Sequence, residues 1–120
     1  MHGGRTFPKR ERLRHGHEFR TVYERGRKTL GKLAVLYVLE EPGQPYVNVG
    51  VVTSRAIGGA VQRNRARRLL REAYRVNKHK LKDNLRMIIA ARTAIRDKRL
   101  REVEAELLRL FDAAGILVNT

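Results

Sequence analysis

The sequence predicts an α+β domain in which a layer of helices covers one face of a single β-sheet. Two observations predict this class. The patterns follow the order helix, two strands, helix, strand, helix, without regular strand–helix alternation, and 120 residues suffice for one hydrophobic core. No internal repeat interrupts them. We therefore expect a two-layer α/β sandwich with residues 9–120 as a single domain and residues 1–8 as a mobile tail.

Three segments have strand patterns. Residues 32–39 (KLAVLYVL) are mostly apolar and rich in β-branched side chains. Residues 46–53 (YVNVGVVT) place valines at every second position, on one face of a strand. Residues 86–91 (RMIIAA) predict a buried strand. Residues 41–45 (EPGQP) have the composition and length of a hairpin turn. We therefore expect the first two strands to be antiparallel neighbours.

Helical periodicity marks both ends of the domain. Phe19, Val22 and Tyr23 recur at helical spacing before Gly26, which predicts a short helix over residues 17–25. A second apolar stripe, which ends at Gly115, consists of Leu100, Val103, Leu107, Leu110 and Phe111. We expect this final helix to pack on the core.

The chain carries a large excess of positive charge. Twenty-seven Lys and Arg against twelve Asp and Glu give +15, which calls for a polyanionic partner, with nucleic acid as the leading candidate. Membrane binding would require aromatic anchors on a basic helix or a lipidation signal, which the sequence lacks. There is no membrane-length apolar run, and the first residues (MHGGR) lack a secretory pattern. We expect a cytoplasmic protein that does not bind membranes.

Residues 63–75 (RNRARRLLREAYR) hold six arginines and sort into two faces when they are placed on a helix. The apolar face comprises Ala66, Leu69, Leu70, Ala73 and Val76. The polar face comprises Asn64, Arg67, Arg68, Arg71, Arg75 and Lys78, with Arg63 and Arg65 on its flanks. We expect one face to pack on the sheet and the other to stay cationic.

A charge run is most often only a solvated helix face. Such a face normally mixes signs, whereas only Glu72 interrupts this run, and like charges at i,i+4 spacing cost a few tenths of a kcal/mol each. A planar guanidinium grips phosphate oxygens bidentately and stacks on bases. The helix is therefore predicted to bind RNA phosphates.

Two features beside this helix have alternative interpretations. Asn64 either caps the helix or hydrogen-bonds a sugar or base edge. Gly58-Gly59-Ala60 either lets an RNA backbone approach main-chain amides or is a flexible connector; it lacks the GKS or GKT ending of a P-loop.

The aromatic residues also have two interpretations. Phe19 and Tyr23 lie one turn apart, and Tyr37 lies in the first long strand. They could form a stacking platform for single-stranded RNA, worth about 1–3 kcal/mol per base, or belong to the core.

The residues of a self-contained enzyme are not evident. There are no cysteines, and His2, His15, His17 and His79 lack metal-ligand spacing. The acids of the final helix, among them Glu102, Glu104 and Glu106, are expected on a solvated surface. We expect no catalytic residue and no metal site in the protein alone.

Residues 50–75 resemble the signature of the bacterial ribonuclease P protein. The matching residues are Gly58, Ala60-Val61, Arg63-Asn64-Arg65, Arg67-Arg68 and Arg71-Glu72. The likeness continues through Lys9-Arg10, Leu13, Phe19, Tyr23, Gly26 and the strands at 35–37 and 88–90, and so covers roughly residues 8–115.

The resemblance implies a protein cofactor of a catalytic RNA that removes the 5′ leader from precursor transfer RNA. The protein would be one subunit of an endoribonuclease whose chemistry belongs to the RNA and to magnesium held chiefly by it. The implied partners are ribonuclease P RNA, with one protein per RNA, and precursor transfer RNA, but not DNA.

The resemblance also assigns residues to these partners. The RNA subunit or nearby phosphates would be bound by Arg63, Asn64, Arg65, Arg67, Arg68, Arg71 and Arg75. The leader cleft would be lined by Phe19, Tyr23, Tyr37 and Arg55. Additional basic contacts would come from Lys9, Arg10 and Arg12.

The family fold has a mostly antiparallel four-stranded sheet with helices on one face and a left-handed strand–helix–strand crossover, against the usual right-handed rule. A further short strand is then needed around residues 27–30. The family commonly has two lysines where this chain has Arg55-Ala56, and an asparagine at Gly59. Because Ala56 replaces one of these two cations, the loop before the arginine-rich helix has one positive charge fewer with which to hold the leader or to order a metal.

Small size and basicity fit a ribosome-associated structural protein equally well. Such a protein would cofractionate with ribosomal subunits and would not prefer precursor over mature transfer RNA. DNA binding is less favoured, because no partner helix with a short turn accompanies the arginine-rich helix.

Overall fold

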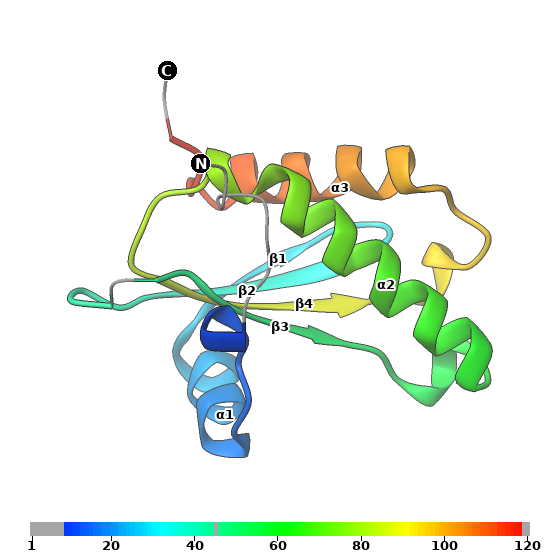
Figure 1. Ribbon diagram of the computed structural model, residues 1–120, viewed down its shortest axis with the longest axis horizontal. Coiled ribbons are helices and arrows are strands. Elements are labelled where there is room, and N and C mark those ends of the chain that lie inside the picture. The colour runs from blue at the N-terminus through cyan, green and yellow to red at the C-terminus, as the bar shows by residue number, and fades with distance from the viewer. Residues whose placement is uncertain (1–8, 45, 119–120) are drawn as a thin grey trace.

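A four-stranded mixed sheet organises the chain in the computed structural model, which describes residues 9–44 and 46–118. Its strands are β1 (Arg27–Leu30), β2 (Ala34–Glu40), β3 (Asn48–Val52) and β4 (Leu85–Ala91), in the spatial order β1-β2-β4-β3. The β1–β2 and β2–β4 pairs are antiparallel, whereas β3 and β4 are parallel (Figure 1). The mostly antiparallel four-stranded sheet and the short strand at residues 27–30 are therefore confirmed.

The expected hairpin between the second and third strands is wrong, because β4 lies between β2 and β3. The reason is the composition of β4, in which Met87, Ile88 and Ile89 are all fully buried. A strand that is apolar on both faces is most stable in the middle of a sheet. The turn after β2 permits a hairpin, but the burial of β4 decides the strand order.

Three helices cover the sheet: α1 (Gly16–Arg25), α2 (Ala60–Asn77) and α3 (Leu100–Ala113). The short helix and the core-packing final helix expected from periodicity are confirmed as α1 and α3. In the described part of the chain, no helix is both long enough and apolar enough to cross a membrane.

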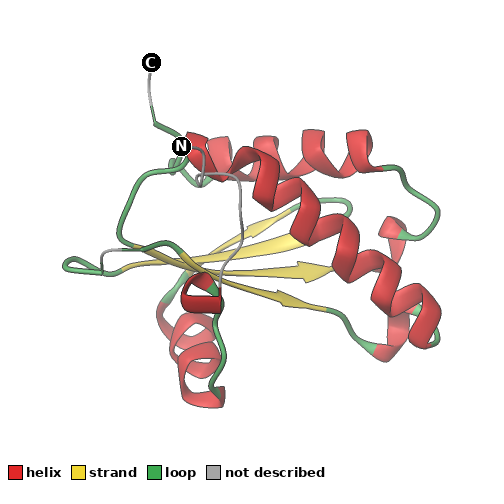
Figure 2. Cartoon of the chain, viewed as in Figure 1, coloured by secondary structure: helices red, strands yellow, loops and turns green. Residues whose placement is uncertain are grey.

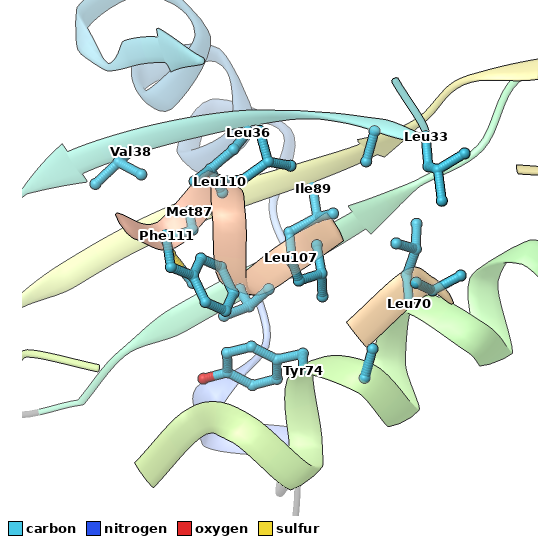
Figure 3. Packing of buried hydrophobic residues seen from close by; sticks show 14 of the residues in the cluster. Leu33, Leu36, Val38, Leu70, Tyr74, Met87, Ile89, Leu107, Leu110 and Phe111 are labelled. Carbon is cyan, nitrogen blue, oxygen red and sulfur yellow. The ribbon is translucent and has the colours of Figure 1, made fainter. Parts of the chain in front are cut away.

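The prediction that the helices lie on one face is wrong. Figure 2 shows α2 and α3 on one side of the sheet and α1 on the other. Two apolar clusters match this arrangement. The larger one joins α2 and α3 to the sheet and includes Leu36, Leu70, Met87 and Phe111 (Figure 3), and the smaller one comprises Leu13, Val22, Leu39 and Ile88. Since β2 and β4 carry apolar residues on both faces, both faces need a cover.

Helix α2 connects the parallel strands β3 and β4 and so forms a strand–helix–strand crossover. The left-handed sense that the resemblance implies for this crossover stays a prediction. The predicted apolar face is buried or half-buried. Tyr74 and Asn77 are also buried, at 0% and 3% exposure, and the sequence had not predicted their burial. Asn77 is accommodated because its Nδ2 donates to the Ala73 carbonyl at 2.8 Å.

Glu106 corrects the expectation that the acids of the final helix are solvated. It is only 2% exposed, and its Oε2 accepts the Leu33 backbone N–H at 2.7 Å. Its other carboxylate oxygen pairs with Arg109. The carboxylate therefore ties the β1–β2 turn to α3, because a buried backbone donor there requires an acceptor.

The N-terminal segment is attached to the end of α2. Residues Lys9–Glu11 form a 3-10 turn, and the Leu13 N–H donates to the Val49 carbonyl on the free edge of β3 at 3.0 Å. Glu11 Oε1 lies 2.7 Å from Lys78 Nζ, and these side chains are only 16% and 9% exposed. The predicted mobile tail, residues 1–8, lies outside the described residues.

We predict that Glu11→Gln lowers the free energy of unfolding by about 1–3 kcal/mol, because it leaves the Lys78 ammonium group in a largely desolvated position. The double variant E11Q/K78M should lose less than the sum of the two single variants, by at least about 0.5 kcal/mol. Urea denaturation of the four proteins measures both quantities. Additive losses would show that the pair is not coupled.

Candidate nucleic-acid interface

The outer face of α2 forms a shallow cationic groove. Its lining leaves a volume of about 450 Å³ and consists of Arg12, Asn64, Arg67, Arg68, Arg71, Glu72 and Arg75. Five of these seven residues are arginines. Arg12 comes from the N-terminal segment, and the Glu11–Lys78 pair and the attachment to β3 explain its position beside α2.

Arg67 is held across the start of this groove. Its Nη1 donates to Asn64 Oδ1 at 2.7 Å, and its Nη2 donates to Thr53 Oγ1, just beyond β3, at 2.8 Å. The capping interpretation of Asn64 is wrong, because α2 begins at Ala60 with Gly59 as its N-cap. Asn64 instead orients an arginine.

Arg68 and Arg71 provide exposed charge in the groove. Partial burial, together with the positive charges of Arg12 and Arg67, lowers the pKa of Arg71. Arginine nevertheless stays protonated in proteins. Burial accounts for the larger part of the shift, and crowding of like charges, which a bound anion would relieve, for the rest.

Arg75 has an acidic partner within the groove. Its Nε and Nη2 donate to the two carboxylate oxygens of Glu72 at 3.0 and 2.6 Å. Hydrogen bonding to Glu72 raises the pKa of Arg75. The positive potential is consequently strongest in the half of the groove toward Arg67, Arg68 and Arg71.

Arg63 and Arg65 lie on the flanks of α2, as predicted, and do not line the groove. Arg63 Nη1 donates to the Gly58 carbonyl at 2.9 Å, and Arg65 Nη2 donates to the Lys98 carbonyl. Gly58 itself has φ +139°, a conformation that side chains disfavour. The turn into α2 therefore requires a glycine at this position, whether or not RNA approaches it.

The aromatic residues fit both interpretations, since they are partly core residues and partly an exposed aromatic surface. Phe19 and Tyr37 are half-buried against the smaller apolar cluster, whereas Tyr23 is 42% exposed. The Tyr23 and Tyr37 rings meet edge to face with centroids 4.8 Å apart, and Lys28 Nζ lies 5.8 Å from the Tyr37 centroid. Burial, followed by the effect of Tyr37, raises the pKa of Tyr23. The three rings belong partly to the core and still present aromatic surface.

Phe19 joins this aromatic surface to the cationic groove. It lies directly against Gly50 of β3, where any side chain would overlap the ring. A hollow of about 210 Å³ is lined by Phe19 and Gly50 together with Arg12, Leu13, Arg14, Val49, Val51 and Arg71. Arg12 and Arg71 line both hollows, so the two are adjacent parts of one surface.

The sheet places Lys28 and Tyr37 in one row with Gly50. The cross-strand partners are Lys28 with Tyr37, Tyr37 with Ile88, and Ile88 with Gly50. In the next row on this face, Leu30 is 67% exposed. The floor beside α1 is therefore apolar and incompletely covered.

The remaining predicted residues lie apart from both hollows. Arg55 is exposed in the 3-10 turn Arg55–Ile57 after β3, and Lys9 is exposed in the N-terminal turn. The side chain of Arg10 lies outside the described part of the structure. Sequence reasoning missed Arg14, Lys28 and Thr53, whose positions depend on long-range strand pairing.

Metal-ligand clusters are absent from residues 9–44 and 46–118, which contain no group of three or more His, Asp or Glu side chains that could hold an ion.

Comparisons with known proteins agree on one family. The family model described as Ribonuclease P matches residues 7–115. The ribonuclease P protein component of Clostridium acetobutylicum is 37% identical over 92% of this chain and 93% of its own length. That of Bacillus pumilus is 33% identical over 90% and 91%.

Solved structures show the same fold. The RNase P protein of Staphylococcus aureus superposes with a TM-score of 0.81 at 22% identity, covering 90% of this chain and 98% of its own. The RNase P protein from Thermotoga maritima gives 0.77 at 25% identity, covering 86% and 96%. The chain therefore belongs to the ribonuclease P protein family, whose members are subunits of the endoribonuclease that processes the 5′ ends of transfer RNA.

Proposed function

We propose that this chain is the protein cofactor of a ribonuclease P in which it binds both the catalytic RNA and the 5′ leader of precursor transfer RNA. One observation carries the proposal: Arg12 and Arg71 join the cationic groove of α2 to the hollow that contains Phe19. A single surface thereby offers phosphate ligands beside an aromatic side chain.

The groove is suited to the RNA subunit. Its guanidinium groups come from one rigid helix and a tethered segment, so little side-chain order has to be gained when phosphates bind. Each neutralised phosphate releases counterions, and affinity should therefore depend strongly on salt.

The aromatic side of the surface is suited to the leader. A single strand exposes its bases, and stacking on a ring tolerates any base, as a cofactor that serves many precursors requires. Tyr23 is the most exposed of the three rings, and Lys28 beside Tyr37 supplies charge for the backbone.

Magnesium belongs to the RNA in this proposal. The protein contributes by neutralising phosphates at the junction of RNA subunit and substrate, which lowers the magnesium concentration needed for assembly. The hydrolysis itself requires no catalytic side chain of the protein.

We predict that adding the protein to ribonuclease P RNA at low magnesium raises the cleavage rate of a leader-bearing precursor. The measurement is single-turnover cleavage with and without protein across a magnesium titration. Binding to the RNA without stimulation at any magnesium concentration would contradict the proposal and favour a structural, ribosome-associated role.

We predict that Arg68→Ala weakens binding to ribonuclease P RNA and lowers the slope of log affinity against log salt by about one unit. Arg68 is exposed and its side chain forms no hydrogen bond or ion pair in the described structure, so thermal stability should not change. Lys82→Ala, an exposed cation outside the groove, is the control. Equal salt slopes for the two variants would mean that Arg68 remains in solvent, without a phosphate contact, in the complex with RNA.

We predict that Tyr23→Ala reduces affinity for precursors with long leaders by about 1–3 kcal/mol and leaves leaderless transfer RNA unaffected. Tyr46→Ala provides a matched control, since Tyr46 is 41% exposed, as against 42% for Tyr23, and is not one of the residues assigned to the leader cleft. Binding is measured with the assembled holoenzyme. The same loss on both substrates would indicate a packing defect.

A further inference from the structure

A second cationic surface lies at the start of α3, outside the groove and the aromatic hollow. Asp97 interrupts a basic segment that runs from the end of β4 into the first turn of α3 and contains four closely spaced cations: Arg96, Lys98, Arg99 and Arg101. We call these residues the α3 patch. Arg96, Arg99 and Arg101 are exposed and Lys98 is half-buried.

Two acids, Asp97 and Glu102, lie beside the α3 patch in sequence, but neither forms an ion pair with it in the residues that the structure describes. None of its four side chains forms an ion pair in the part of the chain that the structure describes. The nearest helical acid, Glu102, uses Oε1 to accept the Arg99 backbone N–H at 3.0 Å. Arg101 also stands in the first turn of α3, where the helix dipole disfavours positive charge. With Asp97 and Glu102 counted, residues 96–102 keep a formal charge of +2 (four cations less two acids), which an external anion would neutralise.

The backbone under the patch is fixed. Ile95 is fully buried in the larger apolar cluster. Next to it, the N–H groups of Ile95, Arg96 and Lys98 donate to the carbonyls three residues earlier at 2.9–3.1 Å. The patch is therefore preformed, and an anion can bind without ordering a loop.

Arg65 connects the patch to α2. Its Nη2 donates to the Lys98 carbonyl, so the flank of α2 lies directly against the patch. Figure 1 shows the segment before α3 beside the first half of α2, at the end of the sheet where β3 and β4 finish. From Arg75 to Arg65 the helix alone spans about 15 Å, so groove and patch together can bind several phosphates.

We propose that the α3 patch is a second docking surface for the phosphate backbone of ribonuclease P RNA, continuous with the groove of α2. This inference rests on the proposed function. The side of the sheet favours the RNA subunit over the substrate: α3 packs on the face opposite α1, so the sheet separates the patch from Phe19, Tyr23 and Tyr37. If those rings hold the leader, the α3 side of the sheet remains free to contact the catalytic RNA.

The test compares two double variants that each remove two exposed charges. Arg96→Gln/Arg101→Gln changes the patch, and Lys80→Gln/Lys82→Gln changes the opposite end of β4. Binding to in vitro transcribed ribonuclease P RNA of a related bacterium is measured across a salt titration. We expect the patch variant to lose about one to two units of salt slope and about tenfold in affinity, and the control to lose less than half a unit.

A third variant, Arg96→Lys/Arg101→Lys, retains the charge and should keep most of the slope, and thermal melting checks that all variants fold. If wild type and patch variant bind alike, or if patch and control variants lose equally, the α3 patch is not a docking surface. Weaker precursor binding with unchanged RNA-subunit binding would assign the patch to the substrate and overturn the inference. If the wild-type protein itself does not bind the RNA, the proposed function fails first.

Discussion

The burial of β4 on both faces is the constraint on which the rest of the structure depends. Because Met87 and Ile89 face one side and Ile88 the other, the strand needs neighbours on both edges and helices on both faces. This requirement places β3 at the edge of the sheet, with α2 over one face and α1 over the other. The arginines of α2 and the aromatic residues of α1 are consequently brought together around a single edge strand.

Apart from the short strand β1, which was expected only from the family resemblance, local patterns were sufficient to predict the three helices, the strands and the two faces of α2, since each depends on residues within a few turns. They failed for the β2–β3 hairpin and for the one-sided helix layer, which depend on competition between distant strands. The burial of Glu106 was missed for the same reason: its partner is the N–H of Leu33, far away in sequence. For the candidate site, the cations of α2 were predictable, but the contribution of Arg14, Lys28 and Thr53 was not.

The electrostatics of α2 separate its arginines by role. Arg67 and Arg63 donate hydrogen bonds to oxygen atoms of the protein, and Arg75 is paired with Glu72. Arg68 and Arg71 remain available to bind an anion. A count of arginines therefore overstates how many guanidinium groups are available for phosphates in the proposed complex. Partial burial, and after it the charges of Arg12 and Arg67, lower the pKa of Arg71. The repulsion among these charges is a cost to the isolated protein and would become a source of affinity once RNA binds.

The contact between Phe19 and Gly50 limits which residues can stand at position 50 beside the aromatic hollow. A hydrogen atom is all that separates the ring from the main chain of β3, so the height of the aromatic ring above the sheet is set by the backbone itself. Any side chain at position 50 would lift α1 or turn the ring outward. The depth of the hollow, and with it the thickness of any base or sugar bound there under the proposed function, is thereby set by the smallest residue in its wall.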